Sequence, residues 1–312
     1  MSRTIAIIGS TGAQGSSVVR SLLSSSQDVS LRALTRDPTS DAVKALPSDS
    51  RLTLVKADLE DVESVKKALE GVQAVFAMTV SGPGEIAQGR NLVDACKAAG
   101  VEHLVFSSLP SIAQASGGKF TGVLHYEMKA QVEQYAKEQL ANVTVVVPGI
   151  FYSHLARPFY TQRQADGTVR FCMSTANSDL SVGFLDASDV GVFVSAILSK
   201  PVSATAGKTY PIMSAPSGQN TASLAAAYAA KTGEKVVVEP ISKEEVTAML
   251  AGMPHGEVVA RAANDLSDYL DSTPAGTTCY GTLSRVDDPT AADLGVKATT
   301  FEEWLEKSGW RA

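Results

Sequence analysis

Residues 4–15 read TIAIIGSTGAQG, and this stretch decides the fold. The apolar, β-branched run at residues 4–8 is typical of a strand that is buried on both faces. It leads straight into three glycines spaced three residues apart, and a helix is predicted from residue 13 to residue 24. A strand, a glycine-rich turn and a helix in this order are typical of the start of a dinucleotide-binding unit.

The glycine spacing is G-x-x-G-x-x-G, which differs from the commoner G-x-G-x-x-G. We expect the same mechanics: a tight turn, a close approach of backbone N–H groups to a pyrophosphate, and close packing of the helix on the strand. The helix N-terminus would add partial positive charge toward the phosphates. The candidate phosphate-binding residues are Gly9, Thr11, Gly12, Ala13, Gln14 and Gly15.

The rest of the first half repeats the strand and helix alternation. Strands are predicted at residues 29–34, 52–55, 74–78, 103–106 and 143–147, and helices at 61–69, 86–99 and 120–140. Repeated units of this kind predict an α/β fold, a Rossmann-type doubly wound parallel sheet, with a smaller C-terminal α+β lobe. We expect residues 1–150 to form the cofactor domain, residues 183–212 to return to its sheet, and residues 151–182 and 213–312 to form the smaller lobe.

Composition excludes several classes of protein. The 312 residues are 44% hydrophobic, with a formal net charge of -6 and no cluster of basic residues, so direct nucleic-acid binding and membrane-surface binding are disfavoured. Three well-separated cysteines form no Cys-x-x-Cys pair, which argues against a metal site and fits a reducing compartment. No apolar run is long enough to cross a bilayer. We therefore expect a cytoplasmic protein, also nuclear if it is regulatory.

The end of the second strand distinguishes NADP from NAD. The chain reads Leu34-Thr35-Arg36-Asp37-Pro38 there. A guanidinium suits a ribose 2′-phosphate through charge-assisted hydrogen bonds, whereas an acidic residue would bind the free 2′-hydroxyl. Arg36 favours NADP(H), and Asp37 keeps NAD open.

Four segments of the chain resemble the NmrA-like family of atypical short-chain dehydrogenase/reductases. They are residues 9–23, residues 35–38, His125-Tyr126-Glu127-Met128-Lys129 with residues 132–135, and residues 300–305. The resemblance implies a Rossmann domain with the cofactor in a cleft, in proteins that either act on small molecules or sense NADP(H). It also implies further cofactor contacts, which fall at the carboxyl ends of predicted strands, from Asp58, Met78, Thr79, Val80, Ser107, Gly149 and Phe151.

The usual catalytic pair of short-chain dehydrogenases is missing. No tyrosine has a lysine four residues later, and His125 stands in that register before Lys129. Three interpretations follow: His125 is the acid/base, Tyr126 reaches in from the next position, or neither is catalytic and Lys129 only holds the cofactor ribose.

The segment after the sixth strand is rich in aromatic residues. Tyr152, His154 and Phe159 would line an apolar substrate pocket, or they would be core of the smaller lobe. Two functions remain open: an NADP(H)-dependent enzyme that reduces or otherwise transforms a small carbonyl, imine or enone compound, and a redox sensor that binds a protein partner.

Overall fold

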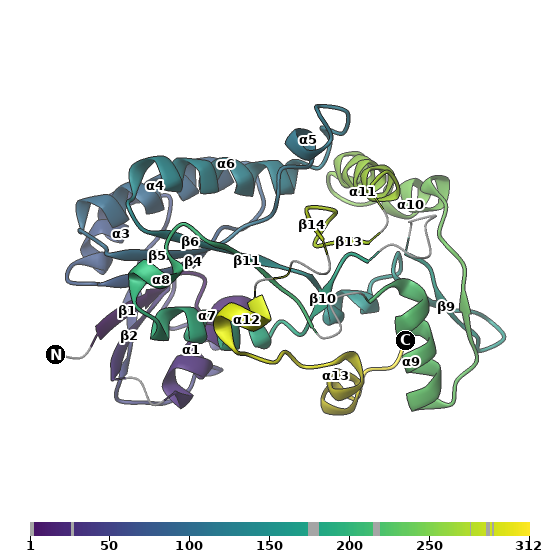
Figure 1. Ribbon diagram of the computed structural model, residues 1–312, viewed down its shortest axis with the longest axis horizontal. Helices are drawn as coiled ribbons and strands as arrows, with labels where there is room; N and C mark the ends of the chain where they lie inside the picture. The colour runs from purple at the N-terminus through teal and green to yellow at the C-terminus, as the bar shows by residue number, and fades with distance from the viewer. Residues whose placement is uncertain are drawn as a thin grey trace.

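A seven-stranded sheet forms the centre of the molecule in the computed structural model (Figure 1). The model describes residues 3–25, 28–173, 181–214, 219–274, 276–284, 288 and 290–312. In spatial order the strands are β11 (Thr209–Ile212), β6 (Val143–Pro148), β5 (His103–Ser107), β4 (Ala74–Met78), β1 (Arg3–Ile7), β2 (Val29–Thr35) and β3 (Leu52–Lys56). All six pairings between them are parallel. The chain therefore has the predicted Rossmann-type doubly wound sheet.

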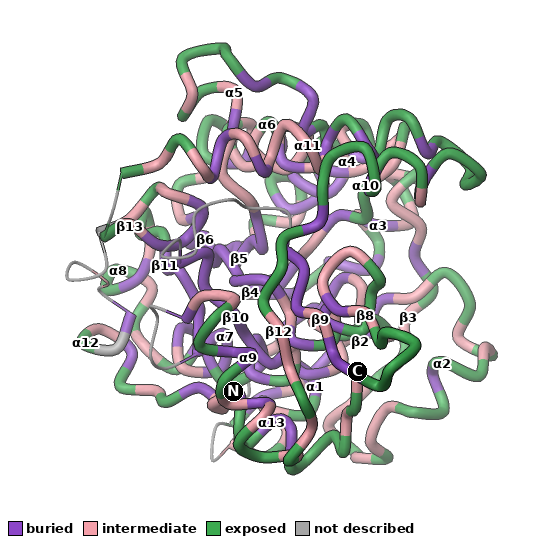
Figure 2. The backbone as a smooth tube through the Cα atoms, turned by 90° about the vertical axis from the view of Figure 1, so that its right-hand side faces the viewer, coloured by how far each residue is buried: buried purple, intermediate pink, exposed green. Residues whose placement is uncertain are grey.

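Helices cover both faces of this sheet because its strands are apolar on both sides (Figures 1 and 2). One face carries α3 (Val62–Leu69), α4 (Glu85–Ala98) and α6 (Leu124–Gln139), and the other carries α1 (Ala13–Ser24) and α7 (Asp189–Ser199). The short helices α2 (Asp41–Lys44), α5 (Ile112–Ala115), α8 (Val202–Thr205) and α12 (Thr290–Leu294) lie in the connections. Strand β11 and helix α7 come from residues 183–212, so this segment packs on the sheet formed by the first half.

A smaller lobe stands at the end of the sheet where the strands finish (Figure 1). Its strands are β8 (Thr161–Arg163), β9 (Val169–Phe171) and β12 (Val236–Val238) in one sheet, β7 (Ile150–Phe151) with β10 (Phe184–Leu185), and β13 (Thr277–Thr278) with β14 (Leu283–Ser284). Its helices are η1 (Tyr152–Ala156), α9 (Thr221–Thr232), α10 (Lys243–Leu250), α11 (Gly256–Asp271) and α13 (Phe301–Ser308). No helix among the described residues has the length and apolar character needed to cross a membrane.

Helix α6 starts later than the sequence predicts. The pattern placed its start at residue 120, whereas the helix begins at Leu124. Residues before it are held by the smaller lobe: the Gly122 amide donates to Asp265 Oδ2 of α11 at 2.7 Å, and Phe120 packs edge-on against Tyr269 at 6.2 Å. These tertiary contacts outcompete the local helical pattern, and they join α11 to the segment that leads into α6.

Candidate functional site

The glycine loop between β1 and α1 has the geometry that its spacing predicts. Gly9 has a φ of +69°, a left-handed conformation that favours glycine. The Gly12 amide donates to the Gly9 carbonyl at 2.9 Å and closes the turn. A Cβ on Gly15 would lie 2.2 Å from the Gly9 oxygen, so only glycine allows this approach of helix to loop. Gly12 is the N-cap of α1 and makes no side-chain cap, which suits an anion at this helix start.

A pocket of about 720 Å³ opens beside this loop. It lies at the carboxyl ends of β1 to β4, next to the point where the strand order reverses between β1 and β4. Seven of the predicted cofactor residues line it: Gly9, Thr11, Gly12, Arg36, Asp58, Met78 and Val80. The pocket has the place and the size expected for part of a dinucleotide.

Arg36 and Asp37 differ in how far their charges are already engaged. Arg36 is exposed at the pocket wall and makes no hydrogen bond or ion pair with the described residues. Asp37 Oδ1 instead accepts from the Thr39 amide at 2.8 Å and from its hydroxyl at 2.6 Å. Those hydrogen bonds hold the pKa of Asp37 below its usual value. The guanidinium is therefore available to an anion, while one carboxylate oxygen of Asp37 is already occupied.

Lys129 belongs to a buried polar group at the end of the pocket. Its Nζ donates to Glu85 Oε1 at 2.5 Å and to the Thr79 carbonyl at 2.7 Å. The Thr79 hydroxyl donates to the same Glu85 oxygen at 2.6 Å. Glu85 lines the pocket and is fully buried, whereas the Lys129 side chain keeps 11% of its surface exposed. The lysine is thus joined to the pocket through Glu85.

His125 lies one turn before Lys129 on α6 and is half-buried. Burial and then the positive charge of Lys129 lower the pKa of His125, and the charge of Glu85 opposes this shift. The imidazole is therefore neutral at pH 7, able to donate one hydrogen bond and accept another.

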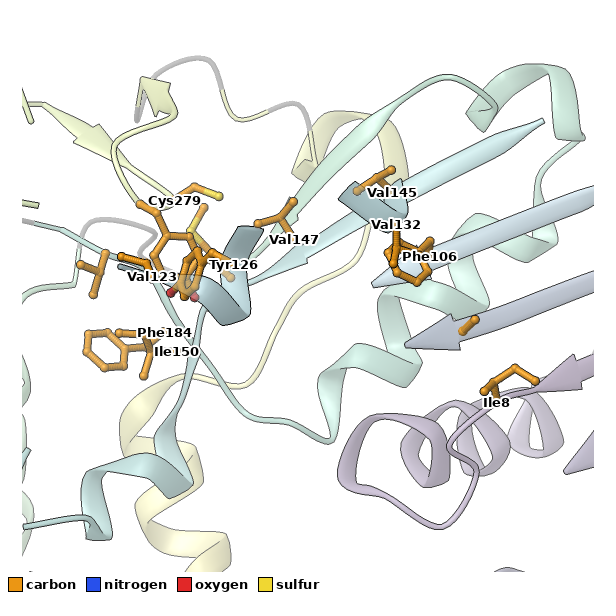
Figure 3. Packing of buried hydrophobic residues seen from close by; sticks show 14 of the residues in the cluster. Ile8, Phe106, Val123, Tyr126, Val132, Val145, Val147, Ile150, Phe184 and Cys279 are labelled. Carbon is orange, nitrogen blue, oxygen red and sulfur yellow. The ribbon is translucent and has the colours of Figure 1, made fainter. Parts of the chain in front are cut away.

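Tyr126 points away from this group into the core. It is 4% exposed, and its ring meets Tyr280 edge-on at 5.3 Å. Figure 3 shows it among the buried side chains of Val123, Val147 and Cys279. Burial raises the pKa of Tyr126 well above its usual value. Because Tyr126 is buried in the core, the interpretation that it acts as the acid or base of the cofactor site is corrected. The helix geometry explains the difference, since neighbouring residues of a helix are turned about 100° apart around its axis.

Four of the other predicted cofactor residues are taken up by contacts within the protein. The Ser107 hydroxyl donates to Gln14 Oε1 at 2.7 Å, which occupies the hydroxyl proton of Ser107 and the side-chain oxygen of Gln14. Gly149 packs so closely on Gly183 that a Cβ would lie 2.8 Å from its oxygen, and Phe151 faces His154 edge-on at 5.7 Å. Ala13, Gln14, Gly15, Thr79, Ser107, Lys129, Gly149 and Phe151 are absent from the lining of the pocket.

The predicted substrate residues are spread apart. Tyr152 is fully buried, packs on Phe184, Phe301 and Trp304, and donates to Gln219 Oε1 at 2.8 Å. Its assignment to a substrate pocket is therefore corrected: it belongs to the core of the smaller lobe. Phe159 packs against a separate cluster that includes Cys172 and Ile241. His154 is half-buried, and burial lowers its pKa to about 4.

Several residues of the site were missed from the sequence. Besides Asp37, which the sequence names as the residue that keeps NAD open, the pocket is also lined by Ile8, Leu34, Thr35, Ser40, Ala42, Ala57, Leu59, Glu60, Ser81, Gly82, Pro83, Gly84, Glu85 and Gln88. The turn Gly82-Pro83-Gly84 directly after β4 is a visible loop pattern that could have indicated the wall at residues 81–84. Glu85 had no comparable pattern, because an acidic residue in the first turn of a helix is common.

Comparison with known proteins places the whole chain in one family. A family model described as the NmrA-like family matches residues 1–305. The NmrA-like family domain-containing oxidoreductase FrzB of Cladobotryum sp is 40% identical over 147 residues, which are 44% of this chain and 43% of that relative. The match thus spans less than half of that relative's own length. The NAD(P)H azoreductase of Xenophilus azovorans is 29% identical over 308 residues, covering 97% of this chain and 96% of its own.

Solved structures agree on the fold. The crystal structure of NmrA, a negative transcriptional regulator, in complex with NAD has a TM-score of 0.75 at 22% identity and covers 100% of this chain and 93% of that one. A second structure of NmrA, in complex with NADP, has a TM-score of 0.74. At this level of identity the likeness shows the shared fold.

Proposed function

Since the chain belongs to the NmrA-like family, we propose that it binds NADP(H) and uses it to reduce a small organic substrate. The observation that carries the proposal is the pocket beside the glycine loop, with Arg36 on its wall and without a hydrogen bond or ion pair to any residue that the structure describes. The similarity of nearly the whole chain to the NAD(P)H azoreductase supports an oxidoreductase activity. NADP and NAD are both bound by the structural neighbour NmrA, so the choice between them rests on this chain's own residues.

Arg36 is the residue that we propose for the 2′-phosphate of NADP(H). The glycine loop would take the pyrophosphate, with Gly12 at the start of α1. Asp37 has only its Oδ2 left for a ribose 2′-hydroxyl, because its Oδ1 already accepts two hydrogen bonds from Thr39. Lys56 is the last residue of β3, paired with Thr35 of β2, and adds positive charge near Asp37. The local charge therefore favours a phosphate over a hydroxyl.

Lys129 and His125 are the residues that we propose at the reacting end. A reduced nicotinamide, when bound, supplies a hydride. The Lys129 ammonium has three N–H donors and uses two of them within the protein, which leaves one for a ribose oxygen. His125, neutral at pH 7 because its pKa is lowered, would orient a polar atom of the substrate by a hydrogen bond.

A titration with NADPH and NADH tests the cofactor assignment. We expect the protein to bind NADPH more tightly than NADH. Arg36→Ala should lower the affinity for NADPH by roughly 10- to 100-fold, because charge-assisted hydrogen bonds to the phosphate are lost. NADH affinity should stay the same. Arg90→Ala, at an exposed arginine on α4, is the matched control. Equal affinities for the two cofactors that do not respond to Arg36→Ala would contradict the assignment.

The second candidate function is a redox sensor that binds a protein partner. The absence of Tyr-x-x-x-Lys from the sequence and the burial of Tyr126 favour it, because both remove the usual acid of reduction. A panel of carbonyl, imine, enone and azo compounds with NADPH separates the two functions. Oxidation of NADPH with any compound supports the enzyme. Absence of turnover with all of them, together with a partner that binds only one redox form, supports the sensor.

A further inference from the structure

Glu85 is a buried acid whose position no general feature of the fold requires. It is the first residue of α4 and is fully buried. Its Oε1 accepts from Lys129 Nζ and from the Thr79 hydroxyl, whereas its Oε2 has no hydrogen-bond partner among the described residues and is closed off from solvent. The start of a helix favours a negative charge, so the local field suits a carboxylate here.

Stability alone is a poor reason to keep this pair. Two charges lose their hydration when they are buried, and their mutual attraction offsets this loss only if every polar atom is satisfied. Here one carboxylate oxygen is unsatisfied, and an unpaired buried acceptor is destabilising. Apolar or uncharged residues of similar size would serve the packing at least as well. The pair therefore calls for a functional explanation at Lys129.

We propose that Glu85 is a positioning residue, which holds the Lys129 ammonium at the end of the pocket so that its third N–H points to the bound dinucleotide. The proposal rests on the proposed function. Glu85 and the Thr79 carbonyl fix two of the three donors of the ammonium, and together they determine the direction of the third. Because Oε1 is occupied by Lys129 and Thr79 and Oε2 is closed off from solvent, the carboxylate of Glu85 acts on the ligand through Lys129.

Two ligands separate a positioning role from a structural one. NADPH contains both halves of the dinucleotide, whereas 2′,5′-ADP contains only the adenosine half with its 2′-phosphate and never reaches Lys129. We expect Glu85→Gln to raise the Kd for NADPH by roughly tenfold, because the charged partner of the ammonium is lost. The Kd for 2′,5′-ADP should stay within about twofold. Glu133→Gln, which removes the carboxylate partner of Lys137 on α6, is the matched control and should change neither Kd.

If Glu85→Gln raises the Kd for NADPH and the Kd for 2′,5′-ADP by the same factor, the variant disturbs the whole site and the proposal is overturned. An unchanged Kd for NADPH would also overturn it. If the wild-type protein binds neither ligand, the proposed function fails and not merely this inference.

A double variant tests whether Glu85 acts through the lysine. We expect Glu85→Gln combined with Lys129→Met to bind NADPH no more weakly than Lys129→Met alone, and to melt no lower than the wild type. A further tenfold loss of NADPH affinity on adding Glu85→Gln to Lys129→Met would overturn the proposal. A lower Tm for the double variant would also overturn it, because the pair would then be held for stability.

Discussion

Replacing Gly15 by alanine adds one methyl group at a point where the structure leaves no room for it. The new Cβ would lie 2.2 Å from the Gly9 oxygen, 2.6 Å from the Gly9 carbonyl carbon and 2.9 Å from the Ser10 Cα. All three are backbone atoms of the turn, so no side chain can rotate away to make space. Helix α1 and the glycine loop must move apart.

The size of the effect follows from that separation. Ordinary contacts start at 3.4 Å, so the loop must shift by roughly 1 Å relative to the helix, and inserting a methyl group into a tightly packed site costs about 1–3 kcal/mol. Alanine is the better helix former by at most about 1 kcal/mol, which offsets part of this cost. We expect a Tm lower by roughly 2–4 °C. NADPH affinity should fall by roughly tenfold or more, because a 1 Å displacement misplaces the phosphate-binding amides.

Gly12→Ala is the matched control for this prediction. Its Cβ would lie 3.3 Å from the Gly9 oxygen, which a small adjustment relieves, and the φ of Gly12 is an ordinary −82°. Gly12 lines the pocket, so this variant should weaken NADPH binding with a nearly unchanged Tm. Thermal melting followed by circular dichroism and a fluorescence titration with NADPH measure both effects. Wild-type melting and wild-type NADPH affinity in Gly15→Ala would refute the close packing on which this argument depends.

Three further predictions concern residues outside the loop. His103 is buried, and its burial, with a smaller contribution from the positive charge of Arg3, lowers its pKa to about 4. In the unfolded chain the imidazole of His103 takes up a proton near pH 6.5. The free energy of unfolding should therefore fall by roughly 3 kcal/mol as the pH drops from about 6.5 to 4. Denaturant titrations across this range should show less of that loss in His103→Gln, and an identical pH dependence would contradict it. Tyr126→Phe should keep NADPH affinity and any turnover while lowering stability by about 1 kcal/mol, and loss of turnover would return Tyr126 to the active site. Gly122→Ala should weaken the packing of α11 on the segment before α6, because the new alanine Cβ would lie 2.5 Å from Asp265 Oδ2. We expect faster amide hydrogen exchange in α11, and unchanged protection there would contradict this prediction.

Local features of the chain predicted the parallel sheet and seven of the residues that line the pocket. The helix after the glycine loop has the predicted bounds, and Asp61 caps a helix at the predicted start. Gly9, Arg36 and Asp58 line the pocket, because each follows a strand of the sheet and parallel strands end on the same edge. The three-stranded sheet of the smaller lobe escaped prediction, since its strands have only three residues each.

The sequence by itself determined the glycine turn and the order of strands and helices, because each depends on residues within a few positions of one another. Only the tertiary structure decided which of two neighbouring residues on α6 packs into the core. His125 and Tyr126 are adjacent in the chain, yet packing against Tyr280 buries one of them in the core. The pairing of Glu85 with Lys129 joins residues 44 positions apart, and such a contact exists only because α4 and α6 lie side by side on one face of the sheet.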